Sequence, residues 1–149
     1  MRAVVQRVSE CSIRVSGRIV AQIGTGLLAY IGVGVSDTER AAAYLADKIP
    51  NLRIFNDEHG SMNLSAIDCS HSICVVSQFT LYGDARKGRR PSYSSAAPPD
   101  QARPLFEYLV DVLTGAGLDV ATGVFGEHMD VRYVNNGPVT ILLDSEKTI

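Results

Sequence analysis

The apolar residues near the start of the chain alternate with polar ones as they do in strands. Ala3–Val8 is an apolar run interrupted by only two polar residues, and Cys11–Val15 has an apolar residue at every second position. A period of two is typical of a half-buried strand. Ser16-Gly17 then signals a turn, and Arg18–Ile23 indicates a third strand, so the pattern predicts a meander.

A nearly continuous apolar run follows at Leu27–Val35, after a further turn that Gly24-Thr25-Gly26 predicts. Such a run predicts a strand that is covered on both faces. Gly32 and Gly34 lie inside it. Glycine within a strand marks either the close approach of another backbone or a bulge, and the pattern alone leaves both readings open.

Two stretches have the spacing of helices. In Ser36-Asp37-Thr38-Glu39, glutamate follows a hydroxyl residue by three positions, which fits the capping box at a helix start. This helix is predicted to end near Ile49, because Pro50 stops it. Pro98-Pro99-Asp100 predicts the start of a second helix, since proline is favourable there. The positions predicted to face inward are Ala42, Leu45 and Ile49 in the first helix and Ala102, Leu105, Phe106, Leu109, Leu113 and Ala116 in the second, with Gly115 and Gly117 as its C-terminal cap.

The remaining segments predict further strands. These are Leu52–Phe55, the buried run Ser72–Ser77, Asp119–Val124, Val131–Asn135 and Val139–Leu143, with a polar turn at 56–60, a loop at 125–130 and an ambiguous segment at 62–67. Many strands in hairpins and two separated helices predict an α+β fold whose largely antiparallel β-sheet curls into a barrel-like shape. No linker or repeat divides the chain, so we expect one domain over residues 1–149.

Composition narrows the class of protein. Hydrophobic residues make up 46% and charged residues 20% of 149 residues, which suits one domain with one core. The net charge of −2 shows no basic excess, so any contact with nucleic acid must come from a local patch. No apolar run approaches the roughly 20 residues that cross a bilayer, and the start of the chain has no signal-peptide layout. Three cysteines without a CxxC favour reduced thiols and a cytoplasmic protein.

The segment Asn135-Asn136-Gly137-Pro138-Val139-Thr140 lies between two apolar runs. Proline cannot donate to a sheet ladder, and glycine has no side chain to pack, so the Gly137-Pro138 pair is unusual there. One reading is a turn between two strands. The other is a rigid backbone device that meets a ligand, and a second polar motif at Ser77–Leu81 favours it.

Ser77-Gln78-Phe79-Thr80-Leu81 follows the buried strand directly and has two hydroxyl groups and an amide. A hydroxyl nucleophile needs an adjacent base. None of the three histidines, His59, His71 and His128, lies in a motif that assigns it this role, and there is no GxSxG elbow. A covalent triad is therefore disfavoured, although its members can be scattered along a chain. The alternative is that Thr80 satisfies backbone groups at a strand end.

Cys69, His71 and Cys74 are zinc ligands by residue type. Cys74 lies in an apolar run, however, where a small buried thiol is the commoner explanation. No fourth ligand is close in sequence, and no GxGxxG or Walker loop is present. We therefore predict neither a metal nor a cofactor.

One cluster of positive charge stands out. Arg86, Lys87, Arg89 and Arg90 lie within five residues, just after the Ser77–Leu81 motif. Such a loop is either a solvated surface or a binding site for the phosphates of a nucleic acid, with an affinity that falls as salt rises. Two nearby aromatic residues, Phe79 and Tyr82, would stack on a base, or Phe79 would instead pack in the core.

Ser77–Leu81 and Asn135–Thr140 together resemble the two signatures of the D-aminoacyl-tRNA deacylase family. The resemblance extends along the chain, through the opening Met1–Val8 and through Asn51–Phe55 and Arg86–Ser92. One position departs from the pattern, since Asn136 stands where aspartate is more usual in the family. The resemblance implies the fold of that family, a curled sheet with two main helices.

The family's members are cytosolic homodimers that cut the ester between tRNA and a D-amino acid, or glycine mischarged on tRNA-Ala, without metal or cofactor. The resemblance implies that Gly137-Pro138 is cis and enters the partner subunit's active site, where it rejects L-amino acids. Arg7 would hold this pair, with Asn135 and Thr140 beside it. Ser77, Gln78, Phe79 and Thr80 would form the catalytic pocket for the terminal adenosine, and the basic cluster would bind tRNA.

The chemistry of such a site is consistent with these residues. Backbone carbonyls at Gly137-Pro138 would accept from the substrate's α-ammonium group, leaving room for hydrogen but not for an L side chain. Backbone N–H groups near Phe79 and Thr80 would stabilise the oxyanion. The attacking water would be activated by the adenosine 2′-hydroxyl, and the older alternative makes Thr80 the nucleophile.

Three other functions stay open. A related deacylase removes L-alanine from mischarged tRNA and keeps a Gly-Pro pair in trans, but it lacks the Ser77–Leu81 motif. A non-catalytic RNA- or DNA-binding module would use Arg86–Arg90 without turnover. An unrelated esterase with a hydroxyl nucleophile would cleave simple esters.

Overall fold

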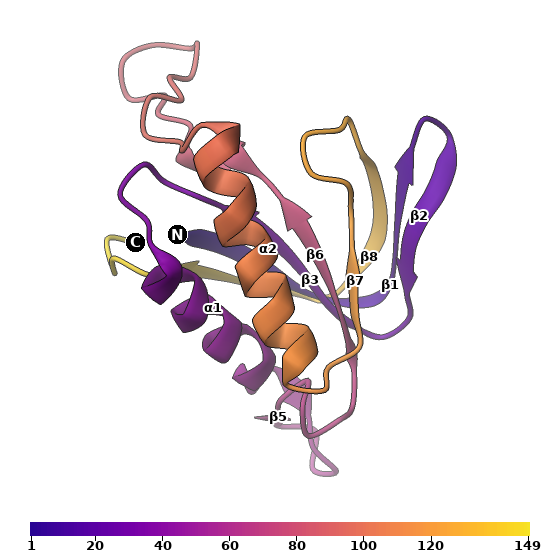
Figure 1. Ribbon diagram of the computed structural model, residues 1–149. Helices are drawn as coiled ribbons and strands as arrows, with labels where there is room; N and C mark the ends of the chain where they lie inside the picture. Colours follow the sequence, from indigo (N-terminus) through magenta and orange to yellow (C-terminus); the bar gives the residue numbers. More distant parts are fainter.

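A long bent hairpin forms the centre of the fold. In the computed structural model, which describes residues 1–149, β1 (Arg2–Val15) pairs antiparallel with both β2 (Arg18–Ile23) and β3 (Gly26–Gly32). β2 lies beside the second half of β1, and β3 lies beside its first half (Figure 1). β2 and β3 therefore run in the same direction, one after the other, and together form the second strand of the hairpin. The predicted meander is therefore wrong, and the chain bends at Gly24-Thr25 without reversing. The reason is the length of β1, which continues through the two polar residues that separated the predicted strands.

The other strands extend the sheet on both sides of this hairpin. β6 (Ser72–Ser77) is parallel to β3, β7 (Val120–Thr122) is parallel to β6, and β8 (Asp130–Asp144) is antiparallel to β1. The predicted α+β class and curled sheet are confirmed, and the two parallel pairings are additions to the prediction. They arise because long connections that contain the helices cross over between β3, β6 and β7.

A small separate hairpin lies outside the main sheet. It consists of β4 (Phe55–Asn56) and β5 (Met62–Leu64). The predicted strand at residues 52–55 is wrong except for Phe55, because the preceding residues pair with no other strand. β5 resolves the ambiguous segment at 62–67 as a short strand followed by turns.

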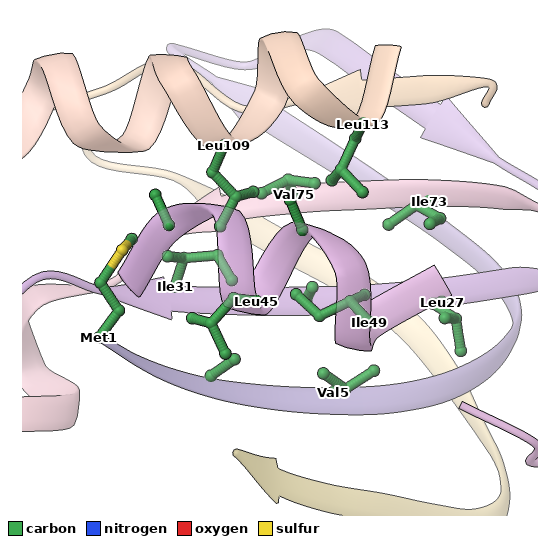
Figure 2. Packing of buried hydrophobic residues seen from close by; sticks show 14 of the residues in the cluster. Met1, Val5, Leu27, Ile31, Leu45, Ile49, Ile73, Val75, Leu109 and Leu113 are labelled. Atoms are coloured by element: carbon green, nitrogen blue, oxygen red, sulfur yellow. The ribbon is translucent and has the colours of Figure 1, made fainter. Parts of the chain in front are cut away.

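The two helices, α1 (Glu39–Asn51) and α2 (Pro99–Gly115), cover one face of the sheet (Figure 1). Figure 2 shows side chains from both helices meeting those of the strands in one apolar cluster. The members labelled there include Val5, Leu27, Ile31, Ile73 and Val75 from strands and Leu45, Ile49, Leu109 and Leu113 from helices. All inward positions predicted for α1 are buried, whereas in α2 Leu105 is half-buried and Ala116 lies exposed beyond the helix end.

The predicted capping box at the start of α1 is wrong. The N-cap is Thr38, whose side chain makes no capping hydrogen bond, and Ser36 instead donates to Glu146 at 3.0 Å. Asp37 turns inward and is buried. Pro50 also fails to stop the helix before it, since α1 continues to Asn51. Neither helix has the length and apolar character needed to span a membrane.

A second apolar cluster fills the opposite face of the sheet, where the strands curl toward one another. It contains Val8, Cys11, Ile13, Ala21, Ile23, Leu28, Cys74 and Val76. β2 lies near β6 and β7 across this cluster, which accounts for the barrel-like curvature. The thiols of Cys11 and Cys74 are free and buried there. The hydrogen bond with Cys11, together with burial, raises the pKa of the Cys74 thiol, so it stays protonated.

Candidate functional site

A pocket of about 660 Å³ opens at the carboxyl ends of the parallel strands β3 and β6. Twelve of the 18 residues that line it are hydrophobic, including Ile31 and Val76 from the strands and Phe106 from α2. Polar groups enter it from Ser77 and Gln78. Ligands of α/β sheets commonly bind outside the carboxyl ends of parallel strands, so this pocket is a candidate ligand site.

The Ser77–Leu81 motif forms the edge of this pocket. β6 ends at Ser77, and the backbone N–H of Gln78 donates to the carbonyl of Ile31 at 2.7 Å, which fixes the exit of the chain. A short 3₁₀ turn, η1 (Phe79–Tyr82), follows. Ser77, Gln78 and Phe79 line the pocket, whereas Thr80 lies just beside it and its hydroxyl accepts a hydrogen bond from the side-chain amide of Gln78.

Phe79 is exposed at the pocket edge. Its side chain is 56% exposed and meets the ring of Tyr93 edge-to-face, with 5.1 Å between the ring centroids. The alternative that Phe79 packs in the core is therefore wrong. Its free face is available for stacking on a ligand.

Tyr82 anchors the far end of the turn and is only 8% exposed. The guanidinium of Arg2 lies 4.6 Å from the centroid of its ring and also donates to the carbonyl of Leu81 at 3.1 Å. Just beyond β3, a Cβ atom added to Gly34 would lie 2.8 Å from the Tyr82 ring. Tyr82 is thus enclosed, and the prediction that it stacks on a base is wrong. Of the two readings of Gly32 and Gly34, the close approach of another backbone is confirmed at Gly32, where an added Cβ would lie 3.0 Å from the carbonyl oxygen of Gln78. At Gly34 a side chain approaches instead.

A buried carboxylate holds the Tyr82 hydroxyl. Asp37 accepts hydrogen bonds from Tyr82 at 3.2 Å and from the backbone N–H of Gly34 at 2.6 Å. It also pairs with the N-terminal ammonium of Met1, which is fully buried. Burial and then the nearby Asp37 charge raise the pKa of Tyr82 well above its ordinary range. Sequence reasoning missed Asp37 because its neighbours resembled a capping box, and the only sequence signal was the pair of glycines.

The Gly137-Pro138 segment is a bulge within one strand. β8 is continuous over 15 residues, and it pairs with β1 both before and after the bulge. Val8 pairs with Asn135 and Gln6 pairs with Thr140, so Arg7 alone faces residues 136–139. The reading of this segment as a turn between two strands is therefore wrong. Proline is tolerated because a bulge does not require its missing N–H in the ladder.

The bulge is exposed at the surface. Gly137 and Pro138 are exposed, and the peptide bond between them is cis, as the family resemblance implies. Gly137 has a φ of +121°, a region that favours glycine. An added Cβ would lie 2.8 Å from the backbone nitrogen of Val139, so glycine is also required sterically.

Side chains replace the missing ladder bonds around the bulge. Arg7 donates from Nε to the carbonyl of Asn136 at 3.3 Å and from Nη1 to the carbonyl of Ile54 at 2.6 Å. The amide nitrogen of Asn135 donates to the carbonyls of Arg7 and Val139, both at 3.0 Å. Its oxygen accepts from Gln6 at 3.0 Å and from Thr140 at 3.3 Å. Sequence reasoning missed Gln6, whose only signal was a polar residue inside an apolar run.

The two predicted groups of site residues do not meet within one chain. None of Asn135–Thr140 lines the large pocket. Arg7 and Asn136 instead line a separate hollow of about 170 Å³ with Asn56. The large pocket and the exposed bulge therefore lie apart within one chain.

The predicted basic cluster lies on a loop that continues from η1. The backbones of Asp84 and Ser92 pair at 2.8 and 2.9 Å and close the loop at its base. Arg86 donates twice to the Asp84 carboxylate, at 2.9 and 2.7 Å, which raises the Arg86 pKa and holds that of Asp84 well below its usual range. Lys87, Arg89 and Arg90 are exposed and form no ion pair within the chain. Three of the four predicted cations are thus free.

Each histidine has a neighbour outside the Ser77–Leu81 motif. His59 lies 3.5 Å from Glu58, His128 lies 3.7 Å from Asp130, and His71 packs against the ring of Phe55. None of them hydrogen-bonds to the hydroxyl groups of the motif, so the chain contains no assembled triad. No group of three His, Cys, Asp or Glu side chains lies close enough to hold a metal ion. His128 and its neighbour Glu127 do line the large pocket, which the sequence analysis did not anticipate.

Comparison with known proteins agrees with the two motifs. The sequence profile of the family described as D-Tyr-tRNA(Tyr) deacylase matches residues 4–144. D-aminoacyl-tRNA deacylases from Desulforamulus reducens and Thermosipho africanus are 58% and 56% identical over 147 residues, which is 99% of this chain and 99% of each relative.

Solved structures share the fold. The c-Myc DNA Unwinding Element Binding Protein superposes with a TM-score of 0.91 at 37% identity, over 97% of this chain and 98% of that one. A probable eukaryotic D-amino acid tRNA deacylase superposes with a TM-score of 0.80, over 95% of this chain and 97% of that one. The latter is 19% identical and so indicates a common fold only.

Proposed function

Because the chain belongs to the D-Tyr-tRNA(Tyr) deacylase family and is an ester hydrolase, a D-aminoacyl-tRNA deacylase, we propose that it proofreads amino-acid chirality with the Gly137-Pro138 bulge. The observation that carries this proposal is the exposure of that bulge on an otherwise regular strand. An exposed bulge offers its carbonyl groups to a partner. Since its substrate belongs to translation, we propose that the protein acts in the cytoplasm.

The large pocket is proposed to bind the 3′-terminal adenosine of tRNA with its aminoacyl group. The predominantly apolar lining suits a planar base, and the exposed ring of Phe79 offers a stacking surface. Lys87, Arg89 and Arg90 lie on the loop that continues from the same turn and would contact phosphates of the acceptor end. The contact positions the RNA without reading its sequence.

The active site is proposed to form between two copies of the chain. The pocket and the bulge are separate within one chain, so a second copy must bring its bulge to the first copy's pocket. Two large apolar side chains on β8 support this homodimer, since Val134 is 50% and Leu142 is 60% exposed. A two-fold axis would then complete two sites at once.

Chiral selection would follow from the shape of the bulge. Carbonyls of Gly137-Pro138 accept from the α-ammonium group, and the backbone fills the space that an L side chain needs. A D side chain points away from the bulge. Glycine has no side chain to exclude, so glycine mischarged on tRNA-Ala is proposed as a second substrate.

Hydrolysis is proposed to be assisted by the RNA. The adenosine 2′-hydroxyl orients a water whose oxygen attacks the ester carbonyl, and backbone N–H groups of η1 stabilise the oxyanion. The bond from the carbonyl carbon to the ribose oxygen then breaks, and that oxygen takes a proton. No histidine hydrogen-bonds to the hydroxyl groups of Ser77 and Thr80, which supports this route over a Thr80 nucleophile.

A second candidate function is binding of nucleic acid without turnover. It is favoured by the likeness to the c-Myc DNA Unwinding Element Binding Protein and by the free cations of the basic loop. Such a protein would bind tRNA or DNA and leave the aminoacyl ester intact.

The test is the release of amino acid from D-Tyr-tRNA, L-Tyr-tRNA and Gly-tRNA, measured side by side with a chelator present. We expect loss of the D and glycyl esters and survival of the L ester. Survival of all three esters while tRNA still binds would favour the second candidate. Thr80→Ala belongs in the same assay, since near-complete loss of turnover in a folded variant would revive the Thr80 nucleophile.

A further inference from the structure

The ladder between β1 and β8 breaks where the bulge leaves the sheet. Arg7 is the only β1 residue opposite four residues of β8, so the backbone groups beside the break lack their regular partners. Two of them, the carbonyls of Arg7 and Val139, accept instead from the side-chain nitrogen of Asn135. This amide therefore joins the two sides of the break.

The orientation of the Asn135 amide follows from its surroundings. Both backbone carbonyls can only accept, so the nitrogen must face them and the oxygen must face the other way. There the oxygen accepts from Nε2 of Gln6 at 3.0 Å. The second hydrogen of the same Gln6 nitrogen points to the hydroxyl oxygen of Thr140 at 3.2 Å.

Gln6 also determines what the Thr140 hydroxyl can do. Because this oxygen accepts from Gln6, its own hydrogen is free to be donated to Asn135 at 3.3 Å or to the carbonyl of Pro138 at 3.5 Å. One glutamine thus connects to both supports of the bulge. The Pro138 carbonyl is a group that the proposed function assigns to the α-ammonium of the substrate.

We propose that Gln6 is a specificity-determining positioning residue, which holds the Gly137-Pro138 bulge through the side chains of Asn135 and Thr140. The inference rests on the proposed function, because it assumes that this bulge selects between D- and L-aminoacyl esters. Loss of the Gln6 amide leaves the Asn135 oxygen with only the Thr140 hydroxyl, at 3.3 Å, and leaves that hydroxyl without its donor. The weakened supports then let the bulge relax into the space that excludes an L side chain.

The experiment compares kcat/KM for L-Tyr-tRNA and D-Tyr-tRNA in matched variants. Gln6→Met keeps the length of the side chain and removes both hydrogen bonds, and we expect the L-to-D ratio to rise about five- to tenfold. Gln6→Glu should raise it further, because an ionised carboxylate cannot donate and forces the Asn135 amide to turn its oxygen toward two carbonyls. Gln22→Met is the control, since Gln22 is an exposed glutamine on β2 of the same sheet.

A double variant tests whether Gln6 acts through Asn135. In an Asn135→Ala background, Gln6→Met should raise the ratio by less than it does in the wild-type background, since only the connection through Thr140 remains. Thr140→Val removes the second connection and should also raise the ratio, which keeps the test available if Gln6→Met fails to fold.

Unchanged discrimination in folded Gln6→Met, or an additive effect in the Asn135→Ala background, would overturn the inference alone. A wild-type protein that cleaves both esters equally, or neither, would instead overturn the proposed function. The two failures are therefore distinguished by the wild-type lane of the same assay.

Discussion

The hydroxyl group of Tyr82 donates a hydrogen bond to the carboxylate of Asp37 at 3.2 Å, although 45 positions separate the two residues. This bond ties the end of the η1 turn to the segment that precedes α1. Arg2 covers the ring from another side. The turn that lines the pocket is therefore held by its far end, away from any ligand.

Gly34→Ala should destabilise the protein. The new Cβ would lie 2.8 Å from the Tyr82 ring, which Arg2 and Asp37 hold in place, so the loss is expected at the upper part of the range of about 1–3 kcal/mol for overpacking. Gly24→Ala is the control, because nothing lies within 4 Å of its added Cβ. Urea denaturation of both variants provides the measurement. Equal stability of the two variants would contradict the conclusion that Arg2 and Asp37 hold the Tyr82 ring in place.

The free energy of unfolding should fall above about pH 10. Burial, followed by a neighbouring negative charge from Asp37 for Tyr82 or from Tyr133 for Tyr30, raises the pKa of both tyrosines. The unfolded chain loses these protons near the ordinary tyrosine pKa of about 10 while the folded chain keeps them. Stability is therefore full below that pH and declines above it, by up to about 1.4 kcal/mol per pH unit for each group.

Tyr82→Phe isolates one of these two groups. It removes the hydrogen bond to Asp37, so stability at neutral pH should fall, by about 1–3 kcal/mol for a buried acceptor left without that partner. It also removes one titrating hydroxyl, so the free energy of unfolding should fall less steeply with pH above about pH 10. Denaturant titrations from pH 7 to pH 11 give both quantities, and an unchanged slope would contradict the assignment of Tyr82.

Gly137→Ala should impair turnover of D-Tyr-tRNA by about 100-fold, since a displacement of about 1 Å at a substrate-positioning group has that effect. The variant has an unfavourable φ of +121° and a Cβ 2.7 Å from the Val139 side chain. Gly60→Ala is a matched control, because Gly60 also has a positive φ, of +79°, but lies in open space beyond β4. Gly60→Ala should lose some stability and keep full turnover. Equal effects on turnover would argue against a role of the bulge.

Binding of tRNA should weaken as salt rises, with unequal contributions from the four cations of the basic loop. Replacing Lys87, Arg89 or Arg90 by alanine should each reduce the slope of log K against log salt by about 0.7–0.9. Arg86→Ala should change it less, because Asp84 already neutralises that side chain.

Asp84→Asn removes the carboxylate that pairs with Arg86, so the Arg86 charge becomes available and tRNA binding should strengthen. Titrations of tRNA at several potassium chloride concentrations measure these slopes. Identical slopes for the Arg86 and Arg89 variants would show that the Asp84 pair does not persist in the complex.

Mixed dimers test whether the active site forms between subunits. A variant with a defective bulge, Gly137→Ala, and one with a defective pocket, Phe79→Ala, should each be weakly active alone. In an equal mixture about half of the dimers are mixed, and each of these has one intact site, so about a quarter of the wild-type activity should return. No recovery after exchange of subunits would contradict the cross-subunit site.

The segments that were predictable from sequence have strong local patterns. The run Ser72–Ser77 corresponds to β6, and Pro98-Pro99-Asp100 predicts the start of α2 at Pro99. Their signals are a continuous apolar run and a proline at a helix start, and both can be recognised from the local sequence without knowing which other segments they contact. The two motifs at Ser77 and Asn135 are also identifiable in the sequence, because their polar residues and the Gly-Pro pair are unusual beside apolar runs.

Other features depend on contacts that local patterns cannot reveal. Asp37 fits a cap in its local sequence, but the ammonium of Met1 and the hydroxyl of Tyr82 determine its position. β1 likewise pairs with β2 along one half and with β3 along the other because it is one continuous strand of 14 residues, which its local sequence does not indicate. Here tertiary partners outweigh the local signal.

The bulge hides a change of face in β8. Val131 and Tyr133 pack against the second apolar cluster, whereas Val139, Ile141 and Leu143 pack against the first, on the opposite face of the sheet. All five positions are odd, so the alternation reads as one uninterrupted face. The bulge inserts an odd number of extra residues, and this reverses which face of the sheet the odd-numbered positions occupy. The number of extra residues can be counted only from the pairing with β1.

Because the pairs on either side of the bulge are Val8 with Asn135 and Gln6 with Thr140, removing residues 136–138 would leave both flanking registers intact. The pairing of β1 with β8 therefore does not depend on the tripeptide, which can be replaced without changing the register of the sheet. Its length and composition are open to redesign while the scaffold stays the same. On the proposed function, enantiomer preference can therefore be engineered, or evolve, without a change in the sheet that displays the tripeptide.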